Sequence, residues 1–141
     1  MVEVRRGGIF IRTMGKEDIT VVIPTLNERD AIGKVISGLR LNGFDKILVV
    51  DGYSTDDTAK VAESNGIPVL MQHGKGKTGA LRTAIERVDT PYLMVMDGDC
   101  TYDCGDVEKF FPHLGLYDEI IGARVNGREN IPRLNRFGNW I

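Results

Sequence analysis

The sequence predicts a doubly wound α/β domain, in which a mostly parallel sheet carries helices on both faces. Three observations lead to this fold class: short apolar runs of strand length, apolar positions with helical spacing between them, and polar loops at the junctions. Strands that alternate strictly with helices leave no room for hairpins, and this order builds parallel sheets with helical crossovers. The 141 residues, 42% hydrophobic and 27% charged, suit a single globular domain.

The expected strands are five apolar runs rich in Val, Ile, Leu and Met. They are Ile19–Pro24, Lys46–Asp51, Pro68–Gln72, Tyr92–Asp97 and Glu119–Ala123. Continuous apolar runs of this length are typical of strands that are buried on both faces.

Helical spacing marks the segments between these runs. The residues that share one face of an expected helix are Ala31, Ile32, Val35, Ile36 and Leu39, then Leu81, Ala84, Ile85 and Val88, then Val107, Phe110, Phe111 and Leu114. Three residues are expected to cap helix starts, each with an acidic residue three positions later: Asn27 with Asp30, Ser54 with Asp57, and Asp103 with Asp106. Gly66, followed closely by Pro68, is expected to end the second helix.

Charge and cysteine content exclude several classes of protein. The net charge is only −2, so no global field favours a nucleic acid or an acidic partner. Cys100 and Cys104, with His73 and His113, give neither a disulfide framework nor a zinc-ligand spacing. No apolar run approaches the roughly 20 residues that span a bilayer. We therefore expect a soluble chain in a reducing, cytoplasmic compartment.

Three regions are expected along the chain. Residues 1–18 are expected to form a flexible extension, residues 19–124 the α/β domain, and residues 125–141 a segment of different character. That last stretch turns basic, with Arg128, Arg133 and Arg136.

The polar loops follow the expected strands and define the candidate site. They lie at residues 24–28, 51–57, 72–77 and 97–99. In an open parallel sheet the ligand lies beyond the carboxyl ends of the strands, where the strand order reverses. Carboxylate, hydroxyl, amide and glycine groups gathered at that one edge favour a binding site over a purely structural domain.

Asp97 and Asp99 are the candidate metal ligands, separated only by Gly98 at the end of an apolar strand. Two carboxylates in one cleft repel each other, and a hard divalent cation, Mg²⁺ or Mn²⁺, relieves the repulsion. The alternative is that both residues only form a turn or cap a helix.

Glu28 and Asp51 are candidate nucleotide contacts, because each follows an apolar strand at the same edge. Gly52 would let a flat ligand approach the backbone, and the Asp51 carboxylate would accept hydrogen bonds from a base or a ribose. Pro24 stiffens the turn that places Glu28. The alternative for Asp51 is a role in capping.

The loop at residues 74–79 is rich in glycine and lysine but does not have the spacing of a P-loop. It enters a helix N-terminus, where Lys75, Lys77 and backbone amides would meet a diphosphate. The alternative is a mobile, solvated loop.

Four ordered motifs give the chain a family resemblance. Residues 22–28, 51–58, 74–80 and 96–102 together resemble the family 2 inverting glycosyltransferases, and among them the dolichol-phosphate mannose synthases, with a GT-A type fold. The resemblance covers residues 19 to about 124. The chain departs from the family at Cys100 and Thr101, where many relatives have Leu and Gln, so the contact of that glutamine is not carried over.

The resemblance implies roles for particular residues. Asp97 and Asp99 are implied to bind the metal and the sugar diphosphate, with Asp99 at the catalytic centre. The residues implied to contact the nucleotide are Pro24, Asn27, Glu28 and Asp51. Arg124, in the Gly-Ala-Arg element at residues 122–124, is implied to face the acceptor phosphate.

The resulting prediction is metal-dependent transfer of a hexosyl group to a polyprenyl phosphate. The favoured donor is GDP-mannose, which would supply a mannosyl group, and the alternative donor is a UDP-sugar. Two rival functions are a partner-dependent nucleotide-sugar-binding module without catalysis and a sugar-1-phosphate nucleotidyltransferase. The glycine- and arginine-rich loop of the latter is replaced here by residues 24–27.

The final residues shape three further expectations. Relatives continue past this point, so we expect the chain to bind the donor but to transfer poorly, with acceptor-side residues 125–141 incomplete. We also expect a peripheral contact at the cytoplasmic face of the membrane, and self-association through an unpaired strand edge.

Overall fold

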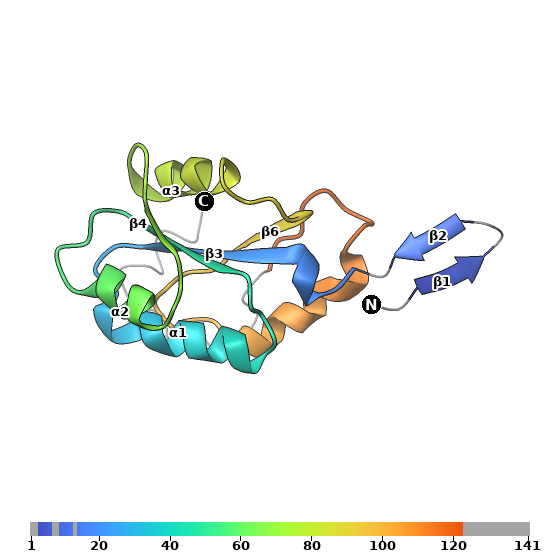
Figure 1. Cartoon of the computed structure of the whole chain (residues 1–141), viewed down its shortest axis with the longest axis horizontal. Coiled ribbons are helices and arrows are strands. Elements are labelled where there is room, and N and C mark those ends of the chain that lie inside the picture. The colour runs from blue at the N-terminus through green and yellow to red at the C-terminus, as the bar shows by residue number, and fades with distance from the viewer. Residues whose placement is uncertain (1–2, 7–8, 13, 123–141) are drawn as a thin grey trace.

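The computed structural model describes the backbone of residues 3–6 and 9–12, and residues 14–122 in full (Figure 1). Its main sheet has four strands in the order β5-β4-β3-β6, and every neighbouring pair is parallel. The strands are β3 (Ile19–Thr25), β4 (Ile47–Asp51), β5 (Val69–Met71) and β6 (Tyr92–Val95). The helices are α1 (Arg29–Leu41), α2 (Thr58–Ser64), α3 (Gly76–Ile85) and the 3₁₀ segments η1 (Lys16–Asp18) and η2 (Cys104–His113). The predicted doubly wound α/β fold is confirmed.

The sheet is covered on both faces. Figure 1 shows α3 on one side of the strands and α1, α2 and η2 on the other. The chain runs outward from β3 through β4 to β5 and then returns through α3 to β6 on the far side of β3. The strand order therefore reverses between β3 and β6, and this is the point where open α/β sheets bind ligands.

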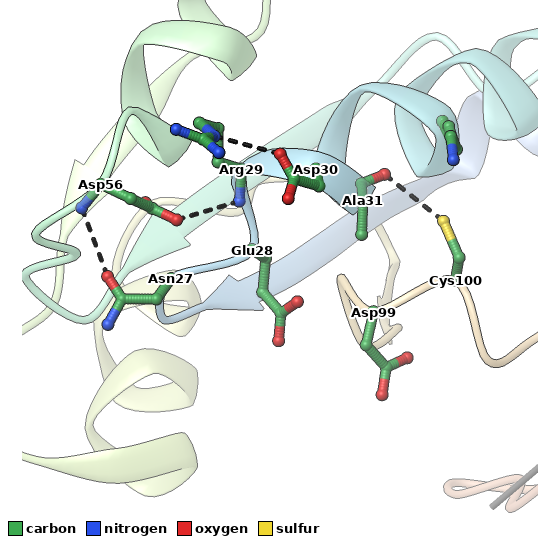
Figure 2. A pocket seen from close by; sticks show the side chains of 9 residues that line it. Asn27, Glu28, Arg29, Asp30, Ala31, Asp56, Asp99 and Cys100 are labelled. Atoms are coloured by element: carbon green, nitrogen blue, oxygen red, sulfur yellow. Dashed lines mark hydrogen bonds and ion pairs between the residues drawn. The ribbon is translucent and has the colours of Figure 1, made fainter.

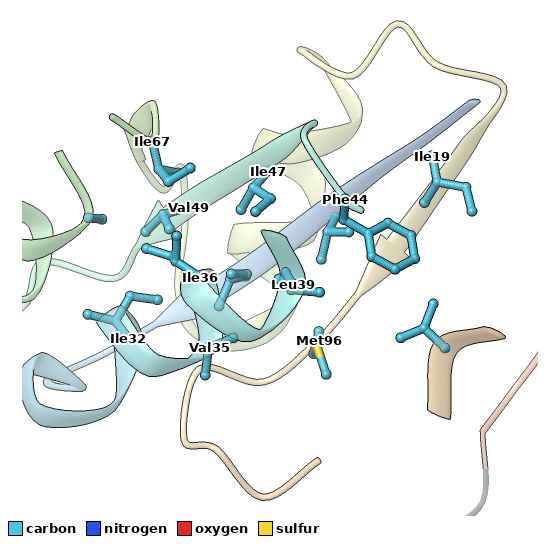
Figure 3. Packing of buried hydrophobic residues seen from close by; sticks show 14 residues of the cluster. Ile19, Ile32, Val35, Ile36, Leu39, Phe44, Ile47, Val49, Ile67 and Met96 are labelled. Carbon is cyan, nitrogen blue, oxygen red and sulfur yellow. The ribbon is translucent and has the colours of Figure 1, made fainter. Parts of the chain in front are cut away.

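Alternation along β3 divides the core into two layers. Val21 and Ile23 pack toward α1, whereas Val22 between them packs toward α3, because successive strand residues point to opposite faces. Figure 3 shows the larger layer, where Ile36 and Leu39 of α1 lie under the sheet. All five of these side chains are fully buried. They fix the helix start that carries part of the candidate site.

Two sequence predictions about elements are corrected. Glu119–Gly122 form no strand, because β6 pairs only with β3 and its other edge has no neighbour within the described residues to supply a ladder. The helical face that includes Val107 and Phe110 belongs to a 3₁₀ segment, which contains Pro112 and so lacks one backbone donor. Ala123, the last residue of the expected fifth strand, lies outside the described residues.

The segment before β3 has more structure than the expected flexible extension. β1 (Glu3–Arg6) and β2 (Ile9–Arg12) pair as an antiparallel hairpin that forms its own sheet (Figure 1). Asp18 is buried and accepts a hydrogen bond from the Gly15 amide. The flexibility of the segment stays a prediction, and residues 125–141 lie outside the described part of the chain.

No helix within residues 14–122 is both long and apolar enough to cross a lipid bilayer.

Candidate functional site

The candidate site lies at the carboxyl edge of the sheet, where β3, β4 and β6 end side by side. Thr25 ends β3 opposite Asp51 at the end of β4, and Val22 pairs with Val95 at the end of β6. The loops that follow these strands contain residues 26–28, 52–57 and 96–103. The expected gathering of polar loops at one edge is confirmed.

Each of these three loops contains one residue with a left-handed backbone. The residues are Asn27 (φ 55°), Tyr53 (φ 64°) and Cys100 (φ 59°). Asparagine tolerates this region, but a bulky tyrosine adopts it only when the surroundings enforce it. Strained backbone is concentrated at functional sites, so three such residues single out this edge as the candidate site.

Asn27 joins two of the loops instead of capping α1. Its side-chain Oδ1 accepts hydrogen bonds from the amides of Thr55 (2.8 Å) and Asp56 (3.4 Å), and its own amide donates to Ser54 Oγ (2.8 Å). Figure 2 shows Asn27 directed at the Asp56 segment. The prediction that Asn27 and Ser54 cap helices is wrong, because both polar groups are used between loops, whereas Asp103 caps η2 as predicted.

Glu28, the N-cap of α1, lies among other acidic residues. Burial raises the pKa of its carboxyl group, and the negative charges of Asp99, Asp56 and Asp97 raise it further. Figure 2 shows the Glu28 and Asp99 carboxylates extending to the same side of the pocket. Pro24, half-buried in β3 beside Val50, places the turn that leads to Glu28. This local field favours a cation.

Asp51 is buried, and its carboxylate is engaged within the protein. Oδ1 accepts hydrogen bonds from Thr25 Oγ1 (3.0 Å) and Ser54 Oγ (2.6 Å), and Oδ2 accepts one from the Ser54 amide (2.7 Å). Gly52 lies against the Thr25 carbonyl oxygen, which accepts a hydrogen bond from the Gly52 amide (2.8 Å). Asp51 therefore shapes the loop after β4. Its direct contact with a nucleotide stays a prediction.

Asp97 and Asp99 lie on a loop that is pressed against β3. A Cβ atom at Gly98 would come within 3.1 Å of Thr25 Cγ2 and 3.3 Å of Ile23 Cγ2, so a larger residue would fit only if these methyl groups shifted by a few tenths of an ångström. Asp99 is exposed, and its Oδ1 accepts hydrogen bonds from the amide (3.0 Å) and the hydroxyl (2.6 Å) of Thr101. Its Oδ2 has no protein partner recorded within the described residues.

Lys77 meets Asp97 across the edge of the sheet. Its Nζ lies 2.7 Å from Asp97 Oδ1, and this hydrogen bond to the carboxylate raises the pKa of Lys77. Lys75, at the N-cap of α3, makes no such pair within the described residues. The structure therefore distinguishes two lysines that the sequence left equivalent.

A pocket of about 450 Å³ opens beside the carboxylates of Glu28 and Asp99. Its lining consists of Asn27, Glu28, Arg29, Asp30, Ala31, Lys34, Asp56, Asp99 and Cys100 (Figure 2). Sequence reasoning assigned no site role to Arg29, Lys34 or Asp56. Asp56 accepts a hydrogen bond from the Arg29 amide (3.2 Å), and hydrogen bonds from Thr58 lower its pKa. Its place in a loop already marked as polar could have identified it.

The donor set fits a hard divalent cation. No group of three or more potential metal ligands gathers within the described residues, so the protein forms no complete cage there. Mg²⁺ and Mn²⁺ sites with one or two carboxylates are completed by substrate phosphates and water. Asp97 and Asp99 supply such a pair beside Glu28, whereas Arg124, the predicted acceptor contact, lies outside the described residues.

Comparison with known sequences gives a family match and several relatives. Residues 20–139 match the family described as Glycosyl transferase family 2. Glycosyltransferase AglJ of Haloferax volcanii is 42% identical over 127 residues, which are 87% of this chain and 42% of that protein. Protein RfbJ of Shigella flexneri is 38% identical over 120 residues, covering 82% of this chain and 93% of its own.

A third relative is named for its acceptor. The dolichyl-phosphate hexose transferase of Haloferax volcanii is 35% identical over 127 residues, covering 87% of this chain and 55% of that protein. The chain thus spans about half the length, or less, of two of these relatives.

Among solved structures, glucosyl-3-phosphoglycerate synthase of Mycobacterium tuberculosis resembles the chain with a TM-score of 0.61 and 28% identity. The match covers 68% of this chain and 39% of that one, and that structure contains Mn²⁺, uridine diphosphate and glucosyl-3-phosphoglycerate. The predicted GT-A type fold agrees with this match.

Proposed function

Because the chain belongs to glycosyl transferase family 2, we propose that it carries the donor site of an inverting hexosyltransferase that uses a nucleotide sugar and a divalent cation. The observation that carries the proposal is the placement of Glu28, Asp97 and Asp99 on loops at the edge where the strand order reverses, close enough for both aspartates to raise the pKa of Glu28. Their negative charges suit a cation that in turn holds a diphosphate.

The acceptor that we propose is a polyprenyl phosphate. The relative named dolichyl-phosphate hexose transferase supports this class of acceptor. For the donor we retain GDP-mannose, with a UDP-sugar as the alternative. The solved relative that contains uridine diphosphate supports the alternative.

Each site residue has one proposed task. Asp97 and Asp99 would hold the cation, which when bound stabilises the negative charge of the departing diphosphate. Lys75 and Lys77 would contact that diphosphate, and Arg124 the acceptor phosphate. In a single displacement the acceptor oxygen forms its bond to the anomeric carbon while the bond to the diphosphate breaks. Because the acceptor is already anionic, this step requires little help from a general base.

Asn27, Pro24 and Asp51 would act mainly on the nucleotide side. Asn27 and Asp51 hold the loop after β4 in place by the hydrogen bonds described above. We propose that this loop contacts the base or the ribose, with Asp51 positioning it. The proposed location is cytoplasmic, at the membrane face where the acceptor head group lies.

Transfer and binding assays with the chain test the proposal. Calorimetry with GDP and UDP, each with Mn²⁺ and with EDTA, should show metal-dependent binding of one of them. Labelled GDP-mannose and UDP-glucose, each with a short polyprenyl phosphate, should then identify the donor. Binding without transfer would favour the partner-dependent module, and release of pyrophosphate from a sugar 1-phosphate and a nucleoside triphosphate would favour the nucleotidyltransferase. A chain that binds neither diphosphate refutes the proposal.

A further inference from the structure

The Lys77–Asp97 pair lies at the edge of the sheet where the proposed function places the ligand. Lys77 is the second residue of α3, which follows β5, whereas Asp97 follows β6. Their 2.7 Å contact therefore joins the N-terminus of α3 to the loop that contains both proposed metal ligands.

The loop before α3 holds Lys77 in place by close backbone packing. Gly74 (φ 87°) and Gly76 (φ 62°) both adopt left-handed backbone conformations. A Cβ atom at Gly79 would lie 2.7 Å from the His73 carbonyl oxygen, so the loop folds tightly onto the first turn of the helix. The amide of His73, in the loop before α3, also donates a hydrogen bond to Oγ1 of Thr83 in α3 (2.7 Å). Only the flexible lysine stem then needs to move for the pair to open.

The two partners differ in exposure. The Asp97 side chain is 27% exposed, whereas that of Lys77 is 75% exposed. An ion pair with one exposed partner is weak and exchanges readily. The Asp97 carboxylate, in contrast, lies near the acidic groups of Glu28 and Asp99, and like charges at such distances favour a cation between them.

We propose, on the basis of the proposed function, that Lys77 is a built-in counterion that Asp97 exchanges for the divalent cation. In the free protein Lys77 neutralises Asp97. When the metal binds, Lys77 releases the carboxylate and its ammonium group turns to the incoming diphosphate.

The exchange has a thermodynamic consequence. Metal alone must displace Lys77 and leaves the ammonium group without a partner, so it binds weakly. Metal with a diphosphate supplies Lys77 with a new anion, so the two ligands strengthen each other's binding equally. Lys77 thus makes the site respond to the metal–diphosphate complex in preference to the free metal.

The test compares Lys77→Met with Lys75→Met. Each substitution removes one positive charge from the start of α3, but only Lys77→Met removes a contact with Asp97. Mn²⁺ alone is titrated into each protein while free Mn²⁺ is followed by electron paramagnetic resonance, and the titration is repeated with saturating GDP or UDP. Lys77→Met should bind Mn²⁺ alone about threefold to fivefold tighter than wild type, the upper part of the range for a lost exposed ion pair. The strengthening of Mn²⁺ binding by the diphosphate should shrink by at least the same factor.

The outcomes separate the inference from the proposed function. If Lys77→Met and Lys75→Met bind Mn²⁺ alone equally well while wild type binds the Mn²⁺–diphosphate complex, the exchange is refuted and the proposed function stands. If wild type binds neither diphosphate with Mn²⁺, the proposed function fails and the exchange fails with it.

Discussion

Thr25 Oγ1 donates a hydrogen bond to Asp51 Oδ1 at 3.0 Å, and this bond joins the ends of two neighbouring parallel strands. Both residues are buried, Thr25 at 5% and Asp51 at 1% exposure. The same carboxylate holds Ser54 in the loop after β4. The fold thus uses a buried, hydrogen-bonded carboxyl group to fix the loop that we assign to the nucleotide.

The first prediction is that Thr25→Val destabilises the protein and weakens nucleotide binding together. The substitution removes the donor while keeping the shape, so the free energy of unfolding should fall by about 1–3 kcal/mol. Diphosphate affinity in EDTA should also fall, because the loop after β4 loses part of its support. Chemical denaturation and calorimetry measure the two effects.

Thr20→Val is the matched control for that prediction. Thr20 lies on the same strand at its other end and shares a hydrogen bond with Thr90 Oγ1 (2.8 Å). Its loss should reduce stability but leave nucleotide affinity unchanged. Equal losses of affinity in both variants would show that the effect on binding reflects stability alone.

The second prediction is that Asp99→Asn weakens metal-dependent nucleotide binding by about tenfold to a hundredfold, the range for a lost contact to a charged group. Asp103→Asn is a close control, because both residues are exposed and both accept a hydrogen bond from the amide two positions later. Calorimetry with Mn²⁺ and GDP or UDP measures the difference. Unchanged affinity in Asp99→Asn would remove this residue from the metal site.

The third prediction concerns Glu28, whose raised pKa means that its negative charge opposes folding. The folded protein holds this proton more tightly than the unfolded chain, so its contribution to stability falls as pH rises through the Glu28 titration. Glu28→Gln should therefore raise Tm at pH 7, and the gain should vanish in acid, where wild-type Glu28 is protonated. The same variant should bind the Mn²⁺–diphosphate complex more weakly.

Glu63→Gln provides the comparison for Glu28→Gln. Glu63 is exposed on α2 and does not line the pocket. Its replacement should leave both Tm and binding near wild type. A Glu28→Gln protein with unchanged Tm at pH 7 would show that the repulsion is already relieved in solution.

The sequence predicted the carboxyl edge of the sheet well, because the position of that edge follows from periodicity alone. In the run Lys46–Asp51 the four residues before Asp51 are apolar, and parallel strands bring their last residues together. The sequence could not show that Asp51 is buried while Asp99 is exposed. That difference depends on which neighbouring loop packs against each carboxylate, and such contacts have no local pattern.

The cap predictions failed for a related reason. Asn27 and Ser54 have the side chains that cap helices. Asn27 N instead donates to Ser54 Oγ and Thr55 N to Asn27 Oδ1, across 27 and 28 residues of the chain, and Ser54 Oγ donates to Asp51. Tertiary contacts between loops thus outcompeted the local helix start. The left-handed backbone of Tyr53 could not be predicted from the sequence either, because a tyrosine side chain favours an extended backbone.

The last prediction concerns the free edge of β6 and expects self-association of the chain. Within the described residues β6 pairs with β3 alone, and Val95 at its end is 48% exposed. An unpaired edge with an apolar residue offers backbone donors and acceptors to a second copy, whereas a lysine on the edge discourages such pairing. Val95→Lys should therefore reduce the dimer fraction measured by analytical ultracentrifugation. Ile85→Lys, at an exposed position on α3 with 61% exposure, changes surface hydrophobicity away from any strand edge and should leave the dimer fraction unchanged. A monomeric wild type, or equal effects of the two lysines, would contradict pairing through β6.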